Sequence, residues 1–235
     1  MRDVTIGSCR IILGDAMALL CRLDEKADLI VTDPPYRLTS GGRNGQVMSG
    51  KFARDRYDNS GDLMDIVSWD EMALPLYHAC KPDADLYVMA NNKQIFPAHA
   101  ALSRAGWRDH NLLAWNKGSP TRNRWYMKDL EYTLYLYKGR AKTIRQPGSK
   151  QLFSAARPDC DWHPTAKPVA LFEHYISNSS DPGDLVIDPF GGSGTCAIAA
   201  LKTGRRCISY EINPEWFERK VARIRKAHDA MPPAV

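Results

Sequence analysis

The chain has 235 residues, of which 44% are hydrophobic and 25% are charged, and its formal net charge is +5. This length and composition predict one globular domain with a sizeable core. No apolar run approaches the roughly 20 residues of a membrane span, and the start, Met1–Ile6, lacks the apolar core of a signal peptide. We therefore expect a cytoplasmic protein. The six cysteines are scattered without a Cys-x-x-Cys pair, so neither a disulfide framework nor a metal site is predicted.

Hydrophobic periodicity predicts strands and helices that alternate through most of the chain. Strands are expected at 10–13, 27–32, 85–90, 111–117, 131–137, about 185–188, and 206–210. Helices are expected at about 16–23, 62–80, 93–105, 168–177, 196–201 and 214–226. This order predicts an α/β fold, a mostly parallel sheet with helices on both faces.

The run Ala27–Thr32 is followed by the tetrapeptide Asp33-Pro34-Pro35-Tyr36. An apolar run that is stopped by two prolines is typical of a buried strand that ends in a rigid turn. Because neither proline has an N–H, the turn offers mainly acceptors, namely the Asp33 carboxylate and backbone carbonyls. Such a site suits a substrate that donates hydrogen bonds, such as an amino group. The alternative is an ordinary strand-end turn in which the aspartate has no chemical role.

A later strand is followed by the glycine-rich turn Asp188-Pro189-Phe190-Gly191-Gly192-Ser193-Gly194-Thr195 and then by a helix. The glycines let the backbone approach a ligand and let the helix N-terminus point its N–H groups at a negative group. Glu211 ends the next strand, about 20 residues further on, where an acidic residue would hold the hydroxyl pair of a ribose. The turn lacks the Gly-Lys-Ser/Thr of a P-loop, and Thr195 in the fifth position excludes a G-x-S-x-G nucleophile elbow.

The strands that precede Asp33 and the glycine turn must be neighbours, because both carry candidate site residues at their carboxyl ends. The crevice between such strands is the switch point of an open α/β sheet, where a dinucleotide-like cofactor would lie.

The stretch from Lys117 to Lys150 contains nine basic residues and two acidic ones, an excess larger than that of the whole chain. A localised basic stretch with aromatic residues among its charges is typical of nucleic-acid binding. The alternative is a solvated loop with an ordinary fluctuation of charge. The DNA-binding candidates are Arg37, Arg43, Lys117, Arg122, Arg124, Trp125 and Lys128.

The polar segment that follows Tyr36 is too long for an ordinary connection. Residues 37–61 are rich in Gly, Ser and Arg, and we interpret them as a mobile lid beside the substrate. Residues 139–162 form a second, shorter segment without an expected strand or helix. We expect both segments to belong to a single domain that spans residues 1–235.

Three motifs in this order resemble the permuted β group of S-adenosylmethionine-dependent DNA amino-methyltransferases. They are Asp33-Pro34-Pro35-Tyr36, then His163-Pro164-Thr165-Ala166-Lys167-Pro168, then the glycine turn that begins at Asp188. The resemblance extends from Leu13 to Trp216 and adds a Gly-Asp pair at Asp15. It implies a Rossmann-like methyltransferase fold, S-adenosyl-L-methionine as cofactor and double-stranded DNA as substrate.

The resemblance also implies site residues. The catalytic motif would be Asp33, Pro34, Pro35 and Tyr36, with Tyr36 stacking on the extruded base. Asp15 would contact the adenine of the cofactor, Glu211 its ribose, and His163 and Lys167 its methionine end, while Asp188 would orient the glycine loop. The cofactor-binding candidates are Asp15, Asp33, His163, Lys167, Asp188, Phe190, Gly191, Gly192, Gly194, Thr195, Glu211 and Asn213.

The target is expected to be an exocyclic amine, because the chain has no Pro-Cys dipeptide for cytosine C5 methylation. Aspartate at the first motif position favours adenine N6, with cytosine N4 as the alternative and RNA adenosine as a weaker one. A non-catalytic DNA-binding relic of the fold is a further alternative. The resembling family usually places its target-recognition region at the position of residues 139–162. Because this segment is short, we expect a homodimer, and a companion restriction enzyme is a further expected partner.

Overall fold

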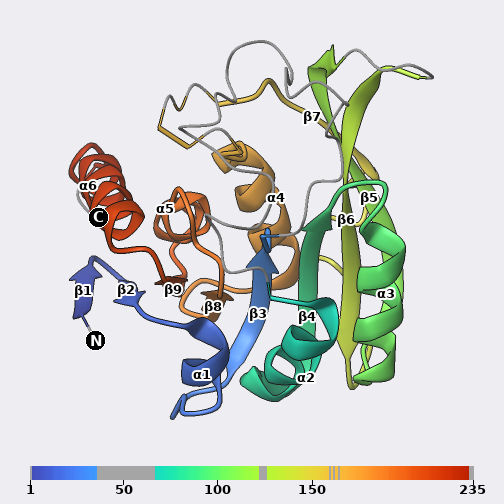
Figure 1. Cartoon of the computed structure of the whole chain (residues 1–235), viewed down its shortest axis with the longest axis horizontal. Helices are drawn as coiled ribbons and strands as arrows, with labels where there is room; N and C mark the ends of the chain where they lie inside the picture. Colours follow the sequence, from blue (N-terminus) through green and yellow to red (C-terminus); the bar gives the residue numbers. More distant parts are fainter. Residues whose placement is uncertain are drawn as a thin grey trace, which may run out of the picture.

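The computed structural model describes residues 2–35, 67–121, 126–158, 160, 162–163 and 165–232. Its centre is a nine-stranded sheet in the order β1-β2-β9-β8-β3-β4-β6-β5-β7 (Figure 1). Five neighbouring pairs are parallel and three, β1–β2, β4–β6 and β5–β6, are antiparallel. The strands are β1 (Arg2–Ile6), β2 (Cys9–Leu13), β3 (Ala27–Thr32), β4 (Cys80–Ala90), β5 (Arg108–Thr121), β6 (Lys128–Lys138), β7 (Leu152–Ser154), β8 (Leu185–Asp188) and β9 (Arg206–Glu211).

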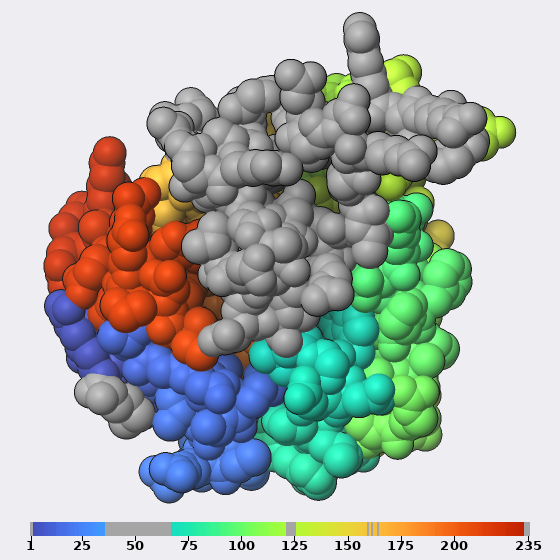
Figure 2. Space-filling view, in the orientation of Figure 1, coloured from blue at the N-terminus to red at the C-terminus, as the bar shows by residue number. Residues whose placement is uncertain are grey.

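Helices cover both faces of this sheet, as the sequence predicted. One core cluster packs buried side chains of α1, α2 and α3 against the sheet, and a second does the same for α4, α5 and α6 on the other face. Figure 2 shows α6 beside the N-terminal strands at one side of the molecule and α3 at the other. The helices are α1 (Ala16–Leu20), α2 (Trp69–Ala79), α3 (Ile95–Arg104), α4 (Val169–Ser179), α5 (Thr195–Lys202) and α6 (Pro214–Asp229).

The two strands that carry the sequence motifs lie side by side in the middle of the sheet. β3 pairs with β8 in parallel through Leu29↔Val186 and Ile30↔Ile187, which confirms the prediction that they are neighbours. Every residue of β8 is buried, and so is every residue of β3 except Asp28. The burial is this complete because helices cover both faces of the sheet at this point. The carboxyl ends of both strands therefore reach the same edge.

The structure differs from the expected elements mainly at the ends of the sheet. The first strand, β1, was not predicted, because four of its five residues are polar or only partly buried and it pairs along a single edge with β2. The helix expected at 62–80 begins at Trp69, after Ser68 forms a capping box with Glu71, and residues 62–66 lie outside the described part. The hairpin of β5 and β6 is also longer than periodicity indicated.

Two further expectations concern general properties of the chain. Within the described ranges, no helix combines the length and the apolar character that a membrane crossing requires. All six cysteines are described as free thiols, and four of them are buried: Cys9, Cys80, Cys196 and Cys207.

Candidate active site

A buried hydrogen bond joins the two motif-bearing strands at their carboxyl ends. The Thr32 hydroxyl donates to Asp188 Oδ1 at 2.8 Å, and the Phe190 N–H donates to the same oxygen at 3.2 Å. Burial raises the pKa of Asp188 to about 6, and these hydrogen bonds counter the rise. The carboxylate that begins the glycine turn is therefore held against the strand that ends at Asp33.

The glycine turn packs so closely on β9, α6 and His163 that two of its glycines have no room for a side chain. A Cβ on Gly191 would lie 2.0 Å from Ser209 Oγ and 2.6 Å from Lys220 Nζ. Gly192 has a φ of +43°, and a Cβ there would lie 2.8 Å from His163 Nε2. The turn is a cradle of bare backbone, as close approach to a ligand requires.

Hydrogen bonds close this cradle and connect it to neighbouring segments. The Gly194 N–H donates to the Gly191 carbonyl at 2.7 Å, immediately before α5 begins at Thr195. The Thr195 hydroxyl donates to the Lys167 carbonyl at 3.2 Å. From α6, Arg223 Nη1 donates to the Ser193 carbonyl at 2.7 Å. The loop is therefore fixed from both sides.

The acidic end of β9 lies next to the turn that contains Asp15. The Gly14 N–H donates to the Glu211 carbonyl at 2.9 Å, and Asp15 Oδ1 accepts from the Met17 N–H as the cap of α1. The Glu211 side chain accepts from the Asn213 N–H at 3.0 Å, and burial raises its pKa. The structure thus brings the sequence candidates Asp15, Glu211 and Asn213 together, although the Asn213 side chain caps α6.

His163 is buried between two tryptophan side chains. Its ring meets those of Trp162 and Trp216 edge-on, at centroid distances of 5.5 and 5.0 Å. Burial, together with nearby Lys167 and Arg223, lowers the pKa of His163 to about 4, so the imidazole is neutral at neutral pH. Its Nδ1 is buried and has no hydrogen-bond partner among the described residues.

Asp33 lies in a cluster of four charged side chains. Lys167 Nζ donates to Asp33 Oδ2 and also lies 3.4 Å from Glu131 Oε2, while Glu131 Oε1 accepts from Lys117 Nζ at 3.3 Å. Burial raises the pKa of Asp33, and the Lys167 ammonium opposes the rise. Burial has the same tendency at Glu131, but Lys167 and Lys117 outweigh it and lower the pKa of that carboxyl. We call these four residues the ion cluster.

The remaining candidates divide between described and undescribed parts of the chain. Pro34 is buried and Pro35 is partly buried, directly after Asp33. Lys128 is exposed at the start of β6, whereas Lys117 is only 7% exposed and paired with Glu131, so its burial argues against the phosphate contact that we expected. Six candidates lie outside the described residues: Tyr36, Arg37, Arg43, Arg122, Arg124 and Trp125.

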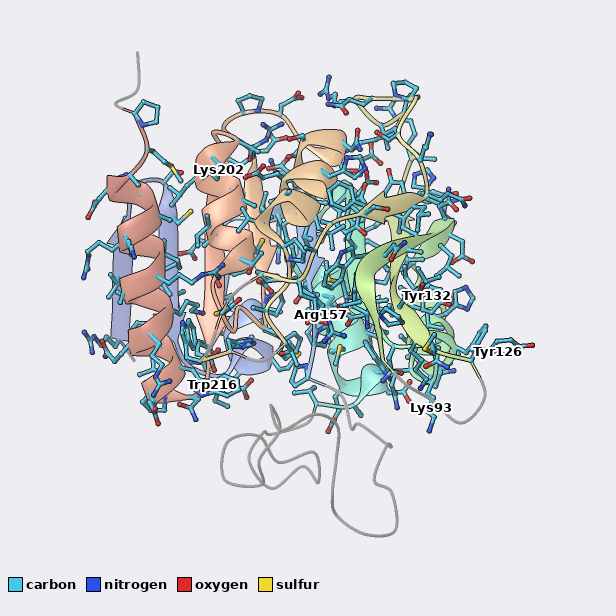
Figure 3. All side chains as sticks on the ribbon, turned by 90° about the horizontal axis from the view of Figure 1, so that it is seen from above. Lys93, Tyr126, Tyr132, Arg157, Lys202 and Trp216 are labelled. Carbon is cyan, nitrogen blue, oxygen red and sulfur yellow. The ribbon has the colours of Figure 1, made fainter. Side chains whose placement is uncertain are left out.

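Figure 3 shows labelled side chains along this edge of the sheet. Trp216, in the first turn of α6, lies at one end and Tyr126 at the opposite end, with Arg157 between them. Tyr126 is 88% exposed at the tip of the β5–β6 hairpin. The cradle and Asp33 thus belong to the middle of an edge that continues outward along the hairpin.

Several site residues were not found from the sequence. Thr32 and Glu131 are positioned by tertiary contacts, for which a single sequence carries no local signal. Lys220 did carry a sequence signal, because its spacing places it on the apolar face of α6 with Phe217 and Ile224. In the structure its side chain is fully buried. Ile212, half exposed beside Glu211, is an aliphatic side chain at the site edge, and its exposure was not foreseen.

Comparison with known proteins agrees with this geometry. The family model described as DNA methylase, for N6 and N4 amino-methyltransferases, matches residues 27–222. The chain belongs to this family, whose members use S-adenosylmethionine as the methyl donor.

Two relatives are type II methyltransferases. The chain is 29% identical over 226 residues to M2.DpnII of Streptococcus pneumoniae, with 86% of the chain and 82% of the relative covered. It is 27% identical over 239 residues to M2.LlaDCHI of Lactococcus lactis subsp. cremoris, with 91% and 88% covered.

Two solved structures share the fold. The M1.HpyAVI–SAM complex has a TM-score of 0.70 and 24% identity, with 92% of the chain and 99% of that structure covered. The cytosine-N4-specific PvuII DNA methyltransferase has a TM-score of 0.69 and 20% identity, with 96% and 93% covered. The Rossmann-like methyltransferase fold is thereby confirmed.

The residues of the cradle fit this cofactor. A Cβ on Gly191 would meet Ser209 and Lys220, and one on Gly192 would meet His163, so both positions require glycine and the backbone of the turn stays bare. Glu211 presents a carboxylate at the end of β9, the position in which an acidic residue accepts hydrogen bonds from a ribose hydroxyl pair. The exposed Ile212 adds an apolar surface beside it.

Proposed function

We propose that this DNA methylase transfers a methyl group from S-adenosylmethionine to the exocyclic N6 of adenine in DNA. One observation carries the proposal: Asp33 lies at the end of the strand next to the glycine cradle, and Lys167 contacts its Oδ2. Lys167 occupies Asp33 Oδ2, and we infer that Oδ1 accepts a hydrogen bond from the substrate amino group.

Asp33 would make the exocyclic amine, a poor nucleophile, more reactive. The lone pair of an exocyclic amine is delocalised into the ring, and acceptors on both N–H groups draw the nitrogen toward tetrahedral geometry. Asp33 Oδ1 and the Pro34 carbonyl are suited to these two roles. When bound, S-adenosylmethionine supplies a methyl group on a positively charged sulfur.

The methyl transfer needs no strong base. The amine nitrogen gives its lone pair to the methyl carbon, the carbon–sulfur bond breaks and its electrons remain on sulfur. The resulting cationic nitrogen then releases a proton to solvent, which leaves a neutral methylated amine. The protein therefore contributes positioning and electrostatic stabilisation, which the fixed Asp33 carboxylate supports.

The substrate base must leave the duplex before it can reach Asp33, at a cost of a few kcal/mol. We infer that Tyr36, the next residue after the two prolines, stacks on the extruded base and returns about 1–3 kcal/mol. We further propose that residues 37–61 act as a lid, that 139–162 take part in target recognition, and that both belong to one domain with the catalytic residues.

The choice of adenine rests on Asp33 as the first residue of its motif. Cytosine N4 is the second candidate, because a cytosine-N4-specific enzyme shares the fold with a TM-score of 0.69. Methylation of genomic DNA with isotope-labelled cofactor, followed by nucleoside analysis, separates the two. We expect labelled N6-methyladenine. Labelled N4-methylcytosine alone would overturn the base assignment. The absence of any labelled nucleoside would overturn the proposed reaction.

Two proposals concern partners. The relatives that are named type II methyltransferases motivate a companion restriction enzyme that reads the same DNA sequence. The short recognition segment motivates a homodimer that presents two basic surfaces to DNA. Sedimentation that shows a monomer both with and without DNA would remove the dimer.

A further inference from the structure

The ion cluster contains two residues that neither sequence motif includes. Lys117 lies on β5 and Glu131 on β6, which pair in antiparallel fashion with Trp115 opposite Glu131. β6 also pairs with β4, where Tyr132 lies opposite Ala90, the last residue of β4. Since β4 is the other neighbour of β3, this register brings Glu131 to the edge at which Asp33 lies.

Glu131 is the member of the cluster that contacts both ammonium groups. Its Oε1 accepts from Lys117 Nζ at 3.3 Å and its Oε2 lies 3.4 Å from Lys167 Nζ. The two lysine side chains are only 7% and 8% exposed. A buried charge is costly unless it is paired, so each ammonium depends on a carboxylate.

The pairing is balanced only while both carboxylates are present. With Glu131 in place, Lys167 shares its charge between Asp33 Oδ2 and Glu131 Oε2, and Lys117 has a carboxylate of its own. Without Glu131, two buried ammonium groups would compete for Asp33 as the remaining carboxylate of the cluster. Both oxygens of Asp33 would then be drawn to lysine, and none would be kept for a substrate.

We propose that Glu131 is a positioning residue for the methyl transfer, which holds Lys167 on Asp33 Oδ2, keeps the Lys117 ammonium away from Asp33, and so leaves Oδ1 for the substrate amine. The inference rests on the proposed function and deepens it. The lowered pKa of Glu131 agrees with this role, because the carboxylate stays ionised between the two ammonium groups.

The first test is Glu131→Gln, which keeps the shape of the side chain and removes its charge. The single-turnover rate on DNA should fall by about 10- to 100-fold, as is typical when a partner of a functional group is lost. Cofactor affinity in a titration should stay within about threefold, since a tenfold change would require about 1.4 kcal/mol. Glu25→Gln, which removes the surface partner of Arg206, is the matched control and should leave both quantities unchanged.

The second test adds Lys117→Met to Glu131→Gln. Removal of the Lys117 ammonium, which loses its carboxylate partner in Glu131→Gln, restores the charge balance, so the double variant should regain at least part of the lost rate. It should also regain part of the loss in thermal unfolding midpoint that Glu131→Gln shows in the free protein. A packing role alone predicts that the second substitution adds its own loss.

The outcomes separate this inference from the proposed function. If wild-type protein methylates DNA and Glu131→Gln does so equally fast, the positioning role is wrong and the proposed function stands. If the double variant is slower and less stable than Glu131→Gln, Glu131 acts through packing and the inference is again overturned. If wild-type protein methylates no DNA, the proposed function itself fails.

Discussion

The two halves of the site are built in different ways. On the side of β8 and β9, the cradle is a glycine turn held by backbone hydrogen bonds, in which the Gly191 N–H donates to the Tyr210 carbonyl and the Gly194 N–H closes the turn. On the side of β3, the ion cluster is made of side chains that come from distant parts of the sequence. The cradle is suited to hold a cofactor in one position. The ion cluster is suited to hold the charged acceptor Asp33 in position for a reacting amine.

This difference predicts that substitutions in the two halves change different quantities. Damage to the ion cluster should lower the rate of transfer while cofactor binding persists. Damage to the cradle should lower cofactor affinity and stability, and a saturating cofactor concentration should restore much of the rate. Each prediction below tests one side of this comparison.

The largest effect is expected for Asp33→Asn. The amide keeps the shape of the side chain but removes the charged acceptor, and loss of one preorganised electrostatic contact typically lowers kcat by about 10²–10³-fold. Single-turnover methylation measures the loss. Asp28→Asn is a matched control on the same strand, because Asp28 pairs with Lys81 at the other end of β3. Equal losses in the two variants would contradict a chemical role for Asp33.

A pH effect is expected from His163 on the cradle side. Its folded pKa of about 4 lies below the ordinary value of 6.5. As the pH falls from about 6.5 to 4, the unfolded chain takes up a proton that the folded protein does not, so stability decreases by up to about 3 kcal/mol from this group.

Denaturant unfolding at pH 7 and pH 4.5 tests the contribution of His163. In His163→Gln, the free energy of unfolding should fall less between these two pH values than it does in the wild type. His99→Gln, at a half-exposed histidine paired with Asp109, should follow the wild type. An unchanged pH dependence in His163→Gln would show that His163 is not held neutral.

A smaller effect is expected for Gly191→Ala. The added Cβ would lie 2.0 Å from Ser209 Oγ, and overpacking of this kind typically costs about 1–3 kcal/mol. Cofactor titration and thermal unfolding should both show the loss. Gly148→Ala is the control, because nothing lies within 4 Å of a Cβ there and the position does not require a positive φ. If both variants bind cofactor as the wild type does, the cradle is not the binding surface.

The smallest effect is expected for Lys128→Ala, outside both halves of the site. Lys128 is exposed near the tip of the β5–β6 hairpin. Loss of one phosphate contact should reduce the slope of log K for DNA binding against log salt concentration by about 0.9. Lys117→Ala should leave this slope unchanged, because Lys117 is buried against Glu131. A change in slope for Lys117→Ala alone would reverse the assignment of the two lysines.

The same division explains what could be predicted from the sequence. The cradle and the ends of β3 and β9 were predicted, because glycine, proline and a strand-end carboxylate are local signals of backbone geometry. The partners of Asp33 were predicted only in part. The assignment of Lys167 to the methionine end of the cofactor stays a prediction, and its contact with Asp33 was not foreseen. Glu131 was predicted only as the first residue of a strand.

The interpretation of Lys117 shows the same limit. In sequence it belongs to a basic stretch and resembles its neighbours, which suggested a phosphate contact. It lies two residues beyond Trp115, which is the β5 partner of Glu131, and its ammonium donates to the Glu131 carboxylate. The strand β1 was missed for a related reason, since it is stabilised by pairing with β2 rather than by an apolar pattern of its own.

The most direct test of the account combines two measurements on the same preparations. Single-turnover methylation of DNA at saturating cofactor, together with cofactor titration, is carried out on the wild type, Asp33→Asn and Gly191→Ala. We expect Asp33→Asn to bind cofactor and transfer almost no methyl group, and Gly191→Ala to bind weakly and yet transfer when saturated. If both variants lose binding and transfer in the same proportion, the site does not divide into a cofactor-holding half and a reacting half.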